Sequence, residues 1–294
     1  RAVRGQPTQR FPVTAVTFTV ADMPTDTAPP AISLRQAMKT FPTRDGGRHT
    51  ALRDVDLDIA EGEFVAVVGP TGCGKSTTLS LVSGLQPASQ GEVLVQGQPV
   101  TSIPAGIGYM FQQDAILPWR TVLDNVTAGP RWRGQQKDAA RELGRDWIER
   151  VGLVGFEHYH PHQLSGGMRK RVALAQTLIN EPSILLMDEP FGALDVQTRE
   201  LMQDSLLELW AESGAAVMFV THDLTEAIAL ADTVVVMTAG PATVKEVVAV
   251  DLPRPRRVEE IRLEPAFLET YRRVWSLLKE EVEITRARGA RNVA

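Results

Sequence analysis

The sequence has little of three features that would point to other kinds of protein. It has one cysteine among 294 residues, so no disulfide can form within the chain. It has no run of about 18 apolar residues, so we expect no segment to span a bilayer. Its formal net charge is −5, so no overall basic field would attract nucleic acid or anionic lipid. With 43% hydrophobic and 23% charged residues, the composition is that of an ordinary globular protein.

A glycine-rich phosphate-binding motif follows the apolar run Phe64–Val68. The motif and the residue after it are Gly69, Pro70, Thr71, Gly72, Cys73, Gly74, Lys75, Ser76 and Thr77. A buried strand therefore leads into a tight turn, and we expect a helix to begin near Lys75. The glycines let backbone N–H groups surround phosphate oxygens, Lys75 can reach the β- and γ-phosphates, and Ser76 can ligate Mg²⁺. The motif predicts a nucleotide site; a glycine turn without a ligand is the alternative.

A pair of carboxylates ends a second apolar run. Ile184–Met187 has strand length and is followed by Asp188 and Glu189. Asp188 can hold Mg²⁺, usually through water, and Glu189 can orient and polarise an attacking water. Two acids at a strand end are common by themselves, but beside a phosphate loop they favour nucleotide hydrolysis.

A second potential anion site opens another helix. Ser165, Gly166 and Gly167 stand where a helix N-terminus would present amides to an anion, and Met168, Val172 and Ala175 would form the inward face of that helix. The chain thus has two phosphate-facing sites, which need not serve the same nucleotide.

The remaining pattern alternates strands and helices. Val55, Leu57 and Ile59 alternate with acidic residues, which predicts a half-buried strand, and residues 91–100 predict a hairpin turning at Gln96-Gly97. We expect a helix-rich zone over about 122–179, including a helix at 137–151, then strands at 184–187 and 216–220 with a helix Thr198–Glu212 between them that stops near Gly214. This pattern predicts an α/β nucleotide-binding core.

Two groups of residues suggest metal sites that the sequence does not favour. Asp54, Asp56 and Asp58 have the spacing of a calcium loop, but Ile59 occupies the position where such a loop needs glycine, so a solvated strand face is the better interpretation. His158, His160 and His162 alternate in a loop with no cysteine nearby, and we interpret that loop as a connection into the helix at Ser165. Cys73 is interpreted as a residue of suitable size, without a redox role.

The two ends of the chain differ from its middle. Residues 1–30 are rich in threonine and proline and are interpreted as a disordered extension or an added edge strand; they lack the continuous apolar region of a secretory leader. Residues 256–294 are interpreted as a helical tail packed on the core, with Trp275, Leu278 and Val282 forming one apolar stripe.

With these motifs in order, the chain resembles the ATPase subunit of an ATP-binding cassette (ABC) transporter over about Ile32–Pro255. Leu164–Met168 is similar to the family signature, and Phe191–Asp195 resembles the D-loop, with Asp195 in its last position. Gln112 resembles the Q-loop glutamine, with Gln113 the alternative. His222, in Thr221-His222-Asp223, resembles the switch histidine, although a structural histidine is the alternative. Phe41 falls where the family stacks an aromatic ring on adenine; a packed loop aromatic is the alternative.

This resemblance implies a fold, a site and a mechanism. The fold would be an α/β P-loop NTPase core of the ABC ATPase type over residues 31–255, with an antiparallel β subdomain and an α-helical signature subdomain at about 113–179. Two ATPase subunits would pair head to tail and hold ATP and Mg²⁺ between the phosphate loop of one and Ser165–Gly167 of the other. Lys75, Glu189 and His222 would be catalytic; Ser76, Gln112 and Asp188 would serve the metal; Phe41 and Asp195 would contact nucleotide.

Two further segments resemble importer ATPases of the nitrate, sulfonate and taurine group. They are Gln112–Val122, with its Leu117-Pro118-Trp119, and Asp251–Arg256. The implied partners are a second copy or a related ATPase subunit, transmembrane permease subunits and, indirectly, a solute-binding protein, but no nucleic acid. The implied location is peripheral, on the cytoplasmic face of the cell membrane.

Two other functions stay open at this point. A soluble cassette ATPase acting on nucleic acid, ribosomes or cluster assembly is disfavoured by the single phosphate loop, the lack of sustained heptads and the acidic charge. An exporter ATPase fits Leu117–Trp119 poorly.

Overall fold

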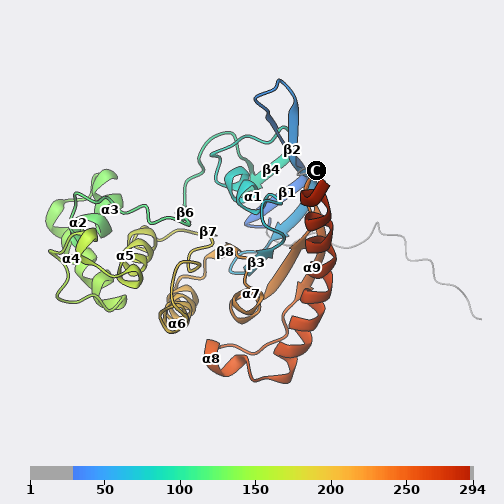
Figure 1. Cartoon of the computed structure of the whole chain (residues 1–294). Helices are drawn as coiled ribbons and strands as arrows, with labels where there is room; N and C mark the ends of the chain where they lie inside the picture. Colours follow the sequence, from blue (N-terminus) through green and yellow to red (C-terminus); the bar gives the residue numbers. More distant parts are fainter. Residues whose placement is uncertain (1–28, 292–294) are drawn as a thin grey trace, which may run out of the picture.

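The computed structural model describes residues 29–291 as two β-sheets, a group of helices beside them and a long C-terminal helix (Figure 1). The predicted extension at residues 1–30 lies outside the described residues except for its last two positions. Within the described range, no helix is both long enough and apolar enough to cross a membrane.

The smaller sheet is antiparallel. Its strands are β1 (Ile32–Pro42), β2 (Arg48–Ile59), β4 (Gln90–Val95) and β5 (Gln98–Pro99), in the order β2-β1-β4-β5. The predicted alternation is confirmed, because Val55, Leu57 and Ile59 are buried and the aspartates between them are exposed. The predicted hairpin at 91–100 is also confirmed, as β4 and β5 flank the turn at Gln96-Gly97.

The larger sheet has six strands in the order β10-β9-β3-β8-β7-β6. They are β3 (Phe64–Val68), β6 (Ile107–Met110), β7 (Ile184–Asp188), β8 (Ala216–Val220), β9 (Thr233–Met237) and β10 (Val244–Ala249). All neighbouring strands are parallel except β10, which pairs antiparallel with β9. The two short apolar runs predicted as strands are therefore confirmed, since they are β7 and β8.

The carboxyl ends of the central strands place the motifs together. β3 ends where the phosphate loop begins, β7 ends at Asp188, and β8 ends at Val220, just before His222. Asp188 pairs with Val220, and Val67 also pairs with Val220. Ligands of open α/β sheets bind outside this edge, so the topology alone gathers the predicted site residues.

Nine helices of four residues or more are present in the described range. They are α1 (Lys75–Val82), α2 (Val122–Val126), α3 (Ala128–Trp132), α4 (Lys137–Arg150), α5 (Gly166–Leu178), α6 (Val196–Ser213), α7 (Leu224–Leu230), α8 (Val258–Ile261) and α9 (Pro265–Arg291), with a short 3-10 turn at Pro161–Gln163. Helices α2–α5 lie together at the left of Figure 1, where the helix-rich zone was predicted. α6 begins two residues before its predicted start because Asp195 caps it, accepting a hydrogen bond from the Thr198 amide.

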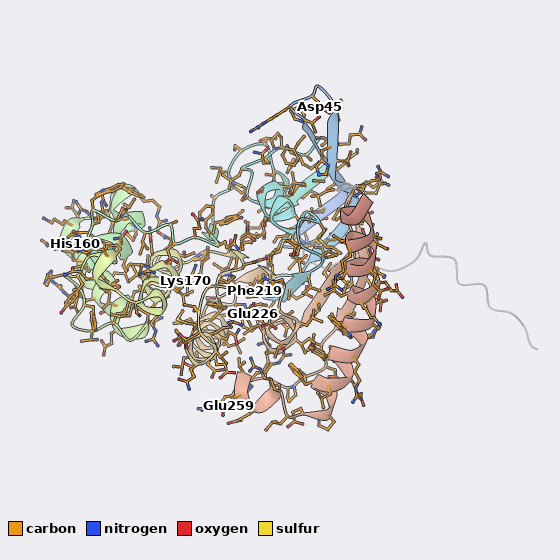
Figure 2. The ribbon with its side chains drawn as sticks, in the orientation of Figure 1. Asp45, His160, Lys170, Phe219, Glu226 and Glu259 are labelled. Atoms are coloured by element: carbon orange, nitrogen blue, oxygen red, sulfur yellow. The ribbon has the colours of Figure 1, made fainter. Side chains whose placement is uncertain are left out.

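The larger sheet separates two hydrophobic clusters. Along β3, Phe64, Ala66 and Val68 belong to the first cluster, which α5, α6 and α7 cover. Val65 and Val67 belong to the second cluster, which α1 and the smaller sheet cover. Successive side chains of a strand point to opposite faces, so a strand buried on both faces is apolar at every position. Phe219 of β8, fully buried, marks the first cluster in Figure 2.

The C-terminal helix α9 corrects one prediction. Val274 and Leu278 pack into the first cluster and Val282 lies partly buried against it, but the side chain of Trp275 is 48% exposed. Residues four apart share a helix face, so the stripe runs through Val274 and Leu278 and leaves Trp275 to one side. The prediction was therefore right for Leu278 and Val282 and wrong for Trp275.

Candidate active site

The phosphate loop closes a tight turn between β3 and α1. Gly72 and Gly74 have φ values of +73° and +128°, which side-chain-bearing residues rarely adopt. A Cβ on Gly74 would lie 2.8 Å from Leu52 Cδ2, so the loop also packs closely on β2. The Lys75 ammonium is buried and donates to the carbonyl oxygens of Gly69 and Pro70, at 2.9 and 3.1 Å. The loop is thus held in shape by its own lysine.

Cys73 belongs to this loop, and only 3% of its surface is exposed. Burial raises the pKa of its thiol, which keeps it protonated and poorly nucleophilic. A Cβ on Gly69 would lie 2.9 Å from its sulfur, so the side chain fills the space that the loop encloses. This agrees with the interpretation of Cys73 as a residue of suitable size.

Ser76 and Asp188 form the oxygen pair beside the loop. The Ser76 hydroxyl donates to Asp188 Oδ1 at 2.9 Å, across 112 positions of sequence. Burial raises the pKa of the Asp188 carboxyl, and the nearby Glu189 charge acts in the same direction, while the Ser76 hydrogen bond and Lys75 oppose them. A hydroxyl and a carboxylate are hard oxygen donors of the kind that Mg²⁺ prefers, so this pair fits the predicted metal position.

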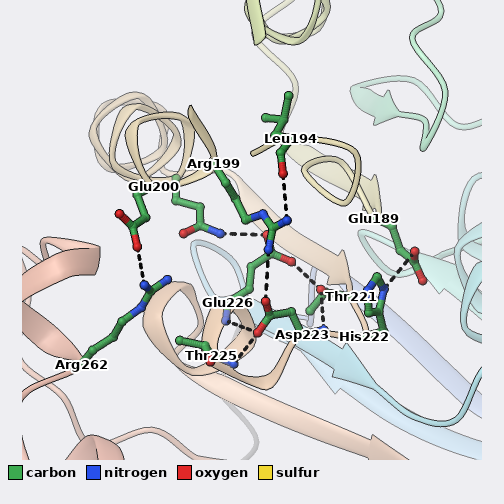
Figure 3. Close-up of polar contacts among 11 residues, drawn as sticks. Glu189, Leu194, Arg199, Glu200, Thr221, His222, Asp223, Thr225, Glu226 and Arg262 are labelled. Atoms are coloured by element: carbon green, nitrogen blue, oxygen red, sulfur yellow. Dashed lines mark hydrogen bonds and ion pairs between the residues drawn. The ribbon is translucent and has the colours of Figure 1, made fainter. Parts of the chain in front are cut away.

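Side chains from two other segments contact Glu189, and Figure 3 shows one of these contacts, that with His222. His222 Nδ1 lies 3.1 Å from its Oε2, and the Gln112 side-chain amide donates to the same oxygen at 3.2 Å. The backbone of Glu189 has φ +43°, an uncommon value for a residue other than glycine. The structure thus brings Glu189, His222 and Gln112 together, while contact of Gln112 with a metal ion stays a prediction.

A cavity of about 190 Å³ opens at this place. Its lining consists of loop residues and the predicted water-orienting carboxylate: Thr71, Gly72, Gly74, Lys75, Ser76, Thr77 and Glu189. Backbone amides at a helix N-terminus, a lysine and a carboxylate therefore face one space. That arrangement suits a phosphate chain with an attacking water at its end.

The second predicted anion site lies at the N-terminus of α5. Ser165 caps the helix by accepting from the Met168 amide at 3.2 Å, and Gly166 and Gly167 form its first turn. Ser165 and Gly166 are exposed, and no described hydrogen bond or ion pair joins this turn to the phosphate loop of the same chain. Within the part of the chain that the structure describes, the two predicted phosphate-facing sites are therefore not bonded to each other.

Phe41 and Asp195 are placed less directly. Phe41 lies on β1 opposite His49, in the same hairpin as the β2 residues that touch Gly74, and the Lys39 ammonium lies 5.0 Å from its ring centre. Asp195 is exposed and caps α6; the Thr198 hydrogen bonds lower the pKa of its carboxyl. Contact of either residue with nucleotide stays a prediction.

Sequence reasoning missed a set of polar residues behind the site (Figure 3). Arg199 on α6 bonds both Leu194 O and Asp223, and Gln203 and Thr221 both bond the buried Glu226. The sequence offered two signals for these residues. Asp223 follows His222 at a position that can cap a helix, and Glu226 is a carboxylate among the apolar residues of α7. Neither signal indicates which residue on α6 it contacts.

Lys170 was missed as well. Its ammonium is 4% exposed, donates to Gln112 O at 2.8 Å and pairs with Asp114 at 2.9 Å. Figure 2 shows it between the helical group and the sheets. The helix that carries the second anion site is therefore tied to the Gln112 segment.

The two rejected metal interpretations find no support in the described residues, where no group of three or more His, Cys, Asp or Glu is placed to hold a metal ion. Asp56 and Asp58 instead accept hydrogen bonds from the Gln36 amide and the Ser33 hydroxyl of β1.

Comparison with known families agrees with this geometry. The family model described as ABC transporter matches residues 52–192. The chain is 47% identical over 238 residues to an uncharacterized ABC transporter ATP-binding protein of Methanocaldococcus jannaschii, covering 81% of this chain and 88% of that protein.

Two further relatives carry functional names. The chain is 42% identical over 241 residues to a taurine import ATP-binding protein of Burkholderia thailandensis, covering 81% and 93% of the two chains. It is 42% identical over 234 residues to a nitrate import ATP-binding protein of Synechococcus elongatus, covering 79% and 85%. Among solved structures, it is similar to a dimeric ATP-binding cassette in a post-hydrolysis state with ADP and Pi, with a TM-score of 0.68, 30% identity, and coverage of 76% and 100%.

Proposed function

Because this chain belongs to the ABC transporter family of ATP-binding proteins, we propose that it is the ATP-hydrolysing subunit of a membrane importer. One observation carries the chemistry: Glu189 is contacted by His222 and Gln112 on the edge of the cavity that the phosphate loop lines. A carboxylate held there is placed to act on a water at the end of a phosphate chain.

Each side chain of the site would have a separate role in hydrolysis. The loop amides and Lys75 would bind the phosphates, and Lys75 would leave its carbonyl partners to do so. Ser76 and Asp188 would hold Mg²⁺, which supplies positive charge next to the β- and γ-phosphates. Glu189 would orient the water and accept its proton, and His222 would hold Glu189 and the γ-phosphate in line. Gln112 would respond to the position of Glu189 through its hydrogen bond to that carboxylate.

The complete site requires two chains. The Ser165–Gly166 turn is exposed and has no described hydrogen bond or ion pair to the phosphate loop of its own chain, which supports a head-to-tail pair in which each turn faces the other chain's nucleotide. A second copy of this chain or a related ATPase subunit would supply it. The dimeric relative with ADP and Pi supports a pair of chains.

The importer assignment rests on the surface that would meet a permease. Trp119 and Trp132 are 72% and 66% exposed, and the Arg120 guanidinium lies 5.5 Å from the Trp132 ring centre. A cavity of about 400 Å³, lined in part by Phe111 and Trp132, opens beside them. Exposed aromatic residues around a hollow suit a partner's helix. The relatives named for taurine import and nitrate import support a small solute of the nitrate, sulfonate and taurine group. The proposal also includes a solute-binding protein as an indirect partner and a peripheral position on the cytoplasmic face of the membrane.

The test is to recover the protein with its partners from its native membrane. The tagged chain should bring a permease, and the Trp119→Ala/Trp132→Ala double variant should lose that permease while keeping the nucleotide-dependent rise in melting temperature. Trp275→Ala is the matched control, since it removes an exposed tryptophan on α9, away from the cavity. Recovery with ribosomes or cluster-assembly proteins instead of a permease would overturn the transport function, and export of the solute by the reconstituted complex would overturn import.

A further inference from the structure

His222 is exposed, although Thr221 before it and Leu224 after it are buried. The His222 side chain is 60% exposed, so its position depends on the backbone at Thr221 and Asp223. Asp223 Oδ1 caps α7 by accepting from the Thr225 and Glu226 amides, and the Asp223 amide donates to the Thr221 hydroxyl at 3.1 Å. These bonds set the shape of the turn, and the Glu189 amide, which donates to Val220 O at 2.9 Å, holds the backbone just before it.

Arg199 joins the part of the turn beyond His222 to the loop after Glu189. One terminal nitrogen of its guanidinium lies 3.4 Å from Asp223 Oδ2, and the other donates to Leu194 O at 2.9 Å (Figure 3). Leu194 ends the loop that starts at Glu189, and Asp223 directly follows His222. A guanidinium is planar and holds its two terminal nitrogens in a fixed fork, so the pair of contacts favours one orientation as well as one distance. The guanidinium thus spans the two loops whose functional side chains meet at 3.1 Å.

A second connection runs parallel to the first, one helical turn further along α6. Gln203, fully buried, donates to Glu226 Oε1 at 2.8 Å, and the Thr221 hydroxyl donates to Oε2 of the same carboxylate. Residues four apart lie on one face of a helix, so α6 presents Arg199 and Gln203 together to the turn after β8. This second connection anchors the base of the turn and leaves Arg199 to connect its tip.

We propose that Arg199 is a positioning residue, which holds His222 in register with Glu189 by joining the loop after Glu189 to the turn around His222. Arg199 does not line the cavity beside the phosphate loop, and it acts through His222. Because Leu194 adjoins Asp195 and the exposed Val196, a shift of this loop on pairing with a second chain would pass through the guanidinium to His222. The inference rests on the proposed ATP hydrolysis and on the proposed role of His222.

The experiment is a mutant cycle on ATP hydrolysis, read under single-turnover conditions so that slow variants can be measured. Arg199→Ala should lower the turnover rate about tenfold or more, with ATP affinity unchanged within about twofold. In a His222→Ala background, the same substitution should change the residual rate by less than about twofold, because the residue through which it acts is already gone.

Arg262→Ala is the matched control. Arg262 forms an arginine–carboxylate pair with Glu200, the neighbour of Arg199 on α6, at a similar depth, and it contacts neither loop (Figure 3). Its removal should leave turnover within about twofold of the parent. Asp223→Asn is a second variant for the case in which Arg199→Ala does not fold, since asparagine caps a helix as well as aspartate does but removes the charge that pairs with Arg199.

The outcomes separate this inference from the proposed function. Equal losses from Arg199→Ala with and without His222, or a loss of ATP affinity that accounts for the whole effect, would overturn the positioning role alone. A parent protein whose hydrolysis is insensitive to both Glu189→Gln and His222→Ala would overturn the proposed mechanism itself.

Discussion

The Nδ1 atom of His222 lies 3.1 Å from Oε2 of Glu189, although the two residues follow different strands. Glu189 adopts a left-handed backbone conformation, and its amide donates to Val220 O, two residues before His222. The carboxylate therefore reaches the histidine because the backbone at Glu189 turns away from the path of β7. Uncommon backbone conformations of this kind occur where a side chain must be aimed.

This relationship leads to a prediction for Glu189→Gln. Glutamine keeps the length and one acceptor oxygen of glutamate but is a much weaker proton acceptor, so ATP binding should persist while turnover falls more than about 100-fold. The slowed variant should accumulate as an ATP-bound dimer, measured by size-exclusion chromatography with light scattering. Hydrolysis near the parent rate would contradict the assigned role. Glu208→Gln, at an exposed position of α6, is the control.

The two glycines at the start of α5 allow a sharper test of the two-chain site. A Cβ on Gly166 would have no atom nearer than 3.9 Å within its own chain, and alanine is favoured over glycine in helices by up to about 1 kcal/mol. Gly166→Ala should therefore leave the melting temperature unchanged or raised, yet lower ATP hydrolysis. The loss would arise where the turn faces a second chain.

Gly167→Ala is the matched contrast. Its Cβ would lie 2.5 Å from Thr198 Cγ2, so this substitution should lower the melting temperature, and adding Thr198→Ser should restore part of it. If Gly166→Ala hydrolyses ATP at the full rate, or if mixed dimers with one altered turn keep both sites at full rate, the head-to-tail arrangement would be wrong.

Asp188→Asn tests the metal position. Burial raises the pKa of the Asp188 carboxyl, so the folded chain disfavours its ionised form, and a neutral asparagine removes that cost at any pH above the normal carboxyl range. Without nucleotide, the variant should melt at or above the parent temperature near neutral pH. It should also lose the additional Mg²⁺-dependent stabilisation by ATP.

Asp58→Asn is the control for that change. Asp58 also accepts a hydrogen bond from a serine hydroxyl, that of Ser33 at 2.5 Å, but it lies on the exposed face of β2. Its substitution should leave the Mg²⁺-dependent shift intact. A full Mg²⁺-dependent shift in Asp188→Asn would show that the cation is held elsewhere.

The features that the sequence could predict are those formed by residues close together in the chain. The strand, the glycine turn and the helix at Lys75 are contiguous, so their spacing alone predicts the loop and α1, and the alternating and continuous apolar runs predict the strands. The convergence of Asp188, Glu189 and His222 follows from a parallel sheet, since carboxyl ends of neighbouring strands meet at one edge.

Contacts between distant residues were not predictable in the same way. Arg199 and Asp223 are 24 positions apart on separate elements, and the local sequence around one does not indicate the other as its partner. Trp275 was assigned to the buried face because it stands at helical spacing from Leu278 and Val282, although Val274 holds that place on α9. Positions 274 and 275 are both apolar, so the sequence pattern alone does not decide which of them faces the core.

The buried carboxyl of Glu226 makes a final prediction, on the pH dependence of stability. Burial raises its pKa, while hydrogen bonds from Thr221 and Gln203 act in the opposite direction. A folded-state pKa above the unfolded value means that the folded chain binds the proton more tightly. The contribution to stability is therefore complete below the unfolded carboxyl pKa of about 4.3 and is lost as pH rises through the folded-state value.

Glu226→Gln removes this titration while keeping a side chain of the same shape. The difference in melting temperature, variant minus parent, should increase as pH rises from about 4 and then stay constant once Glu226 has ionised in the folded chain. Glu208→Gln, at its exposed position on α6, should instead follow the parent across the same range. A parent that gains on Glu226→Gln with rising pH would show that the hydrogen bonds from Thr221 and Gln203 outweigh the burial. The connection from α6 to the turn at His222 would then be a charged one that stabilises the fold.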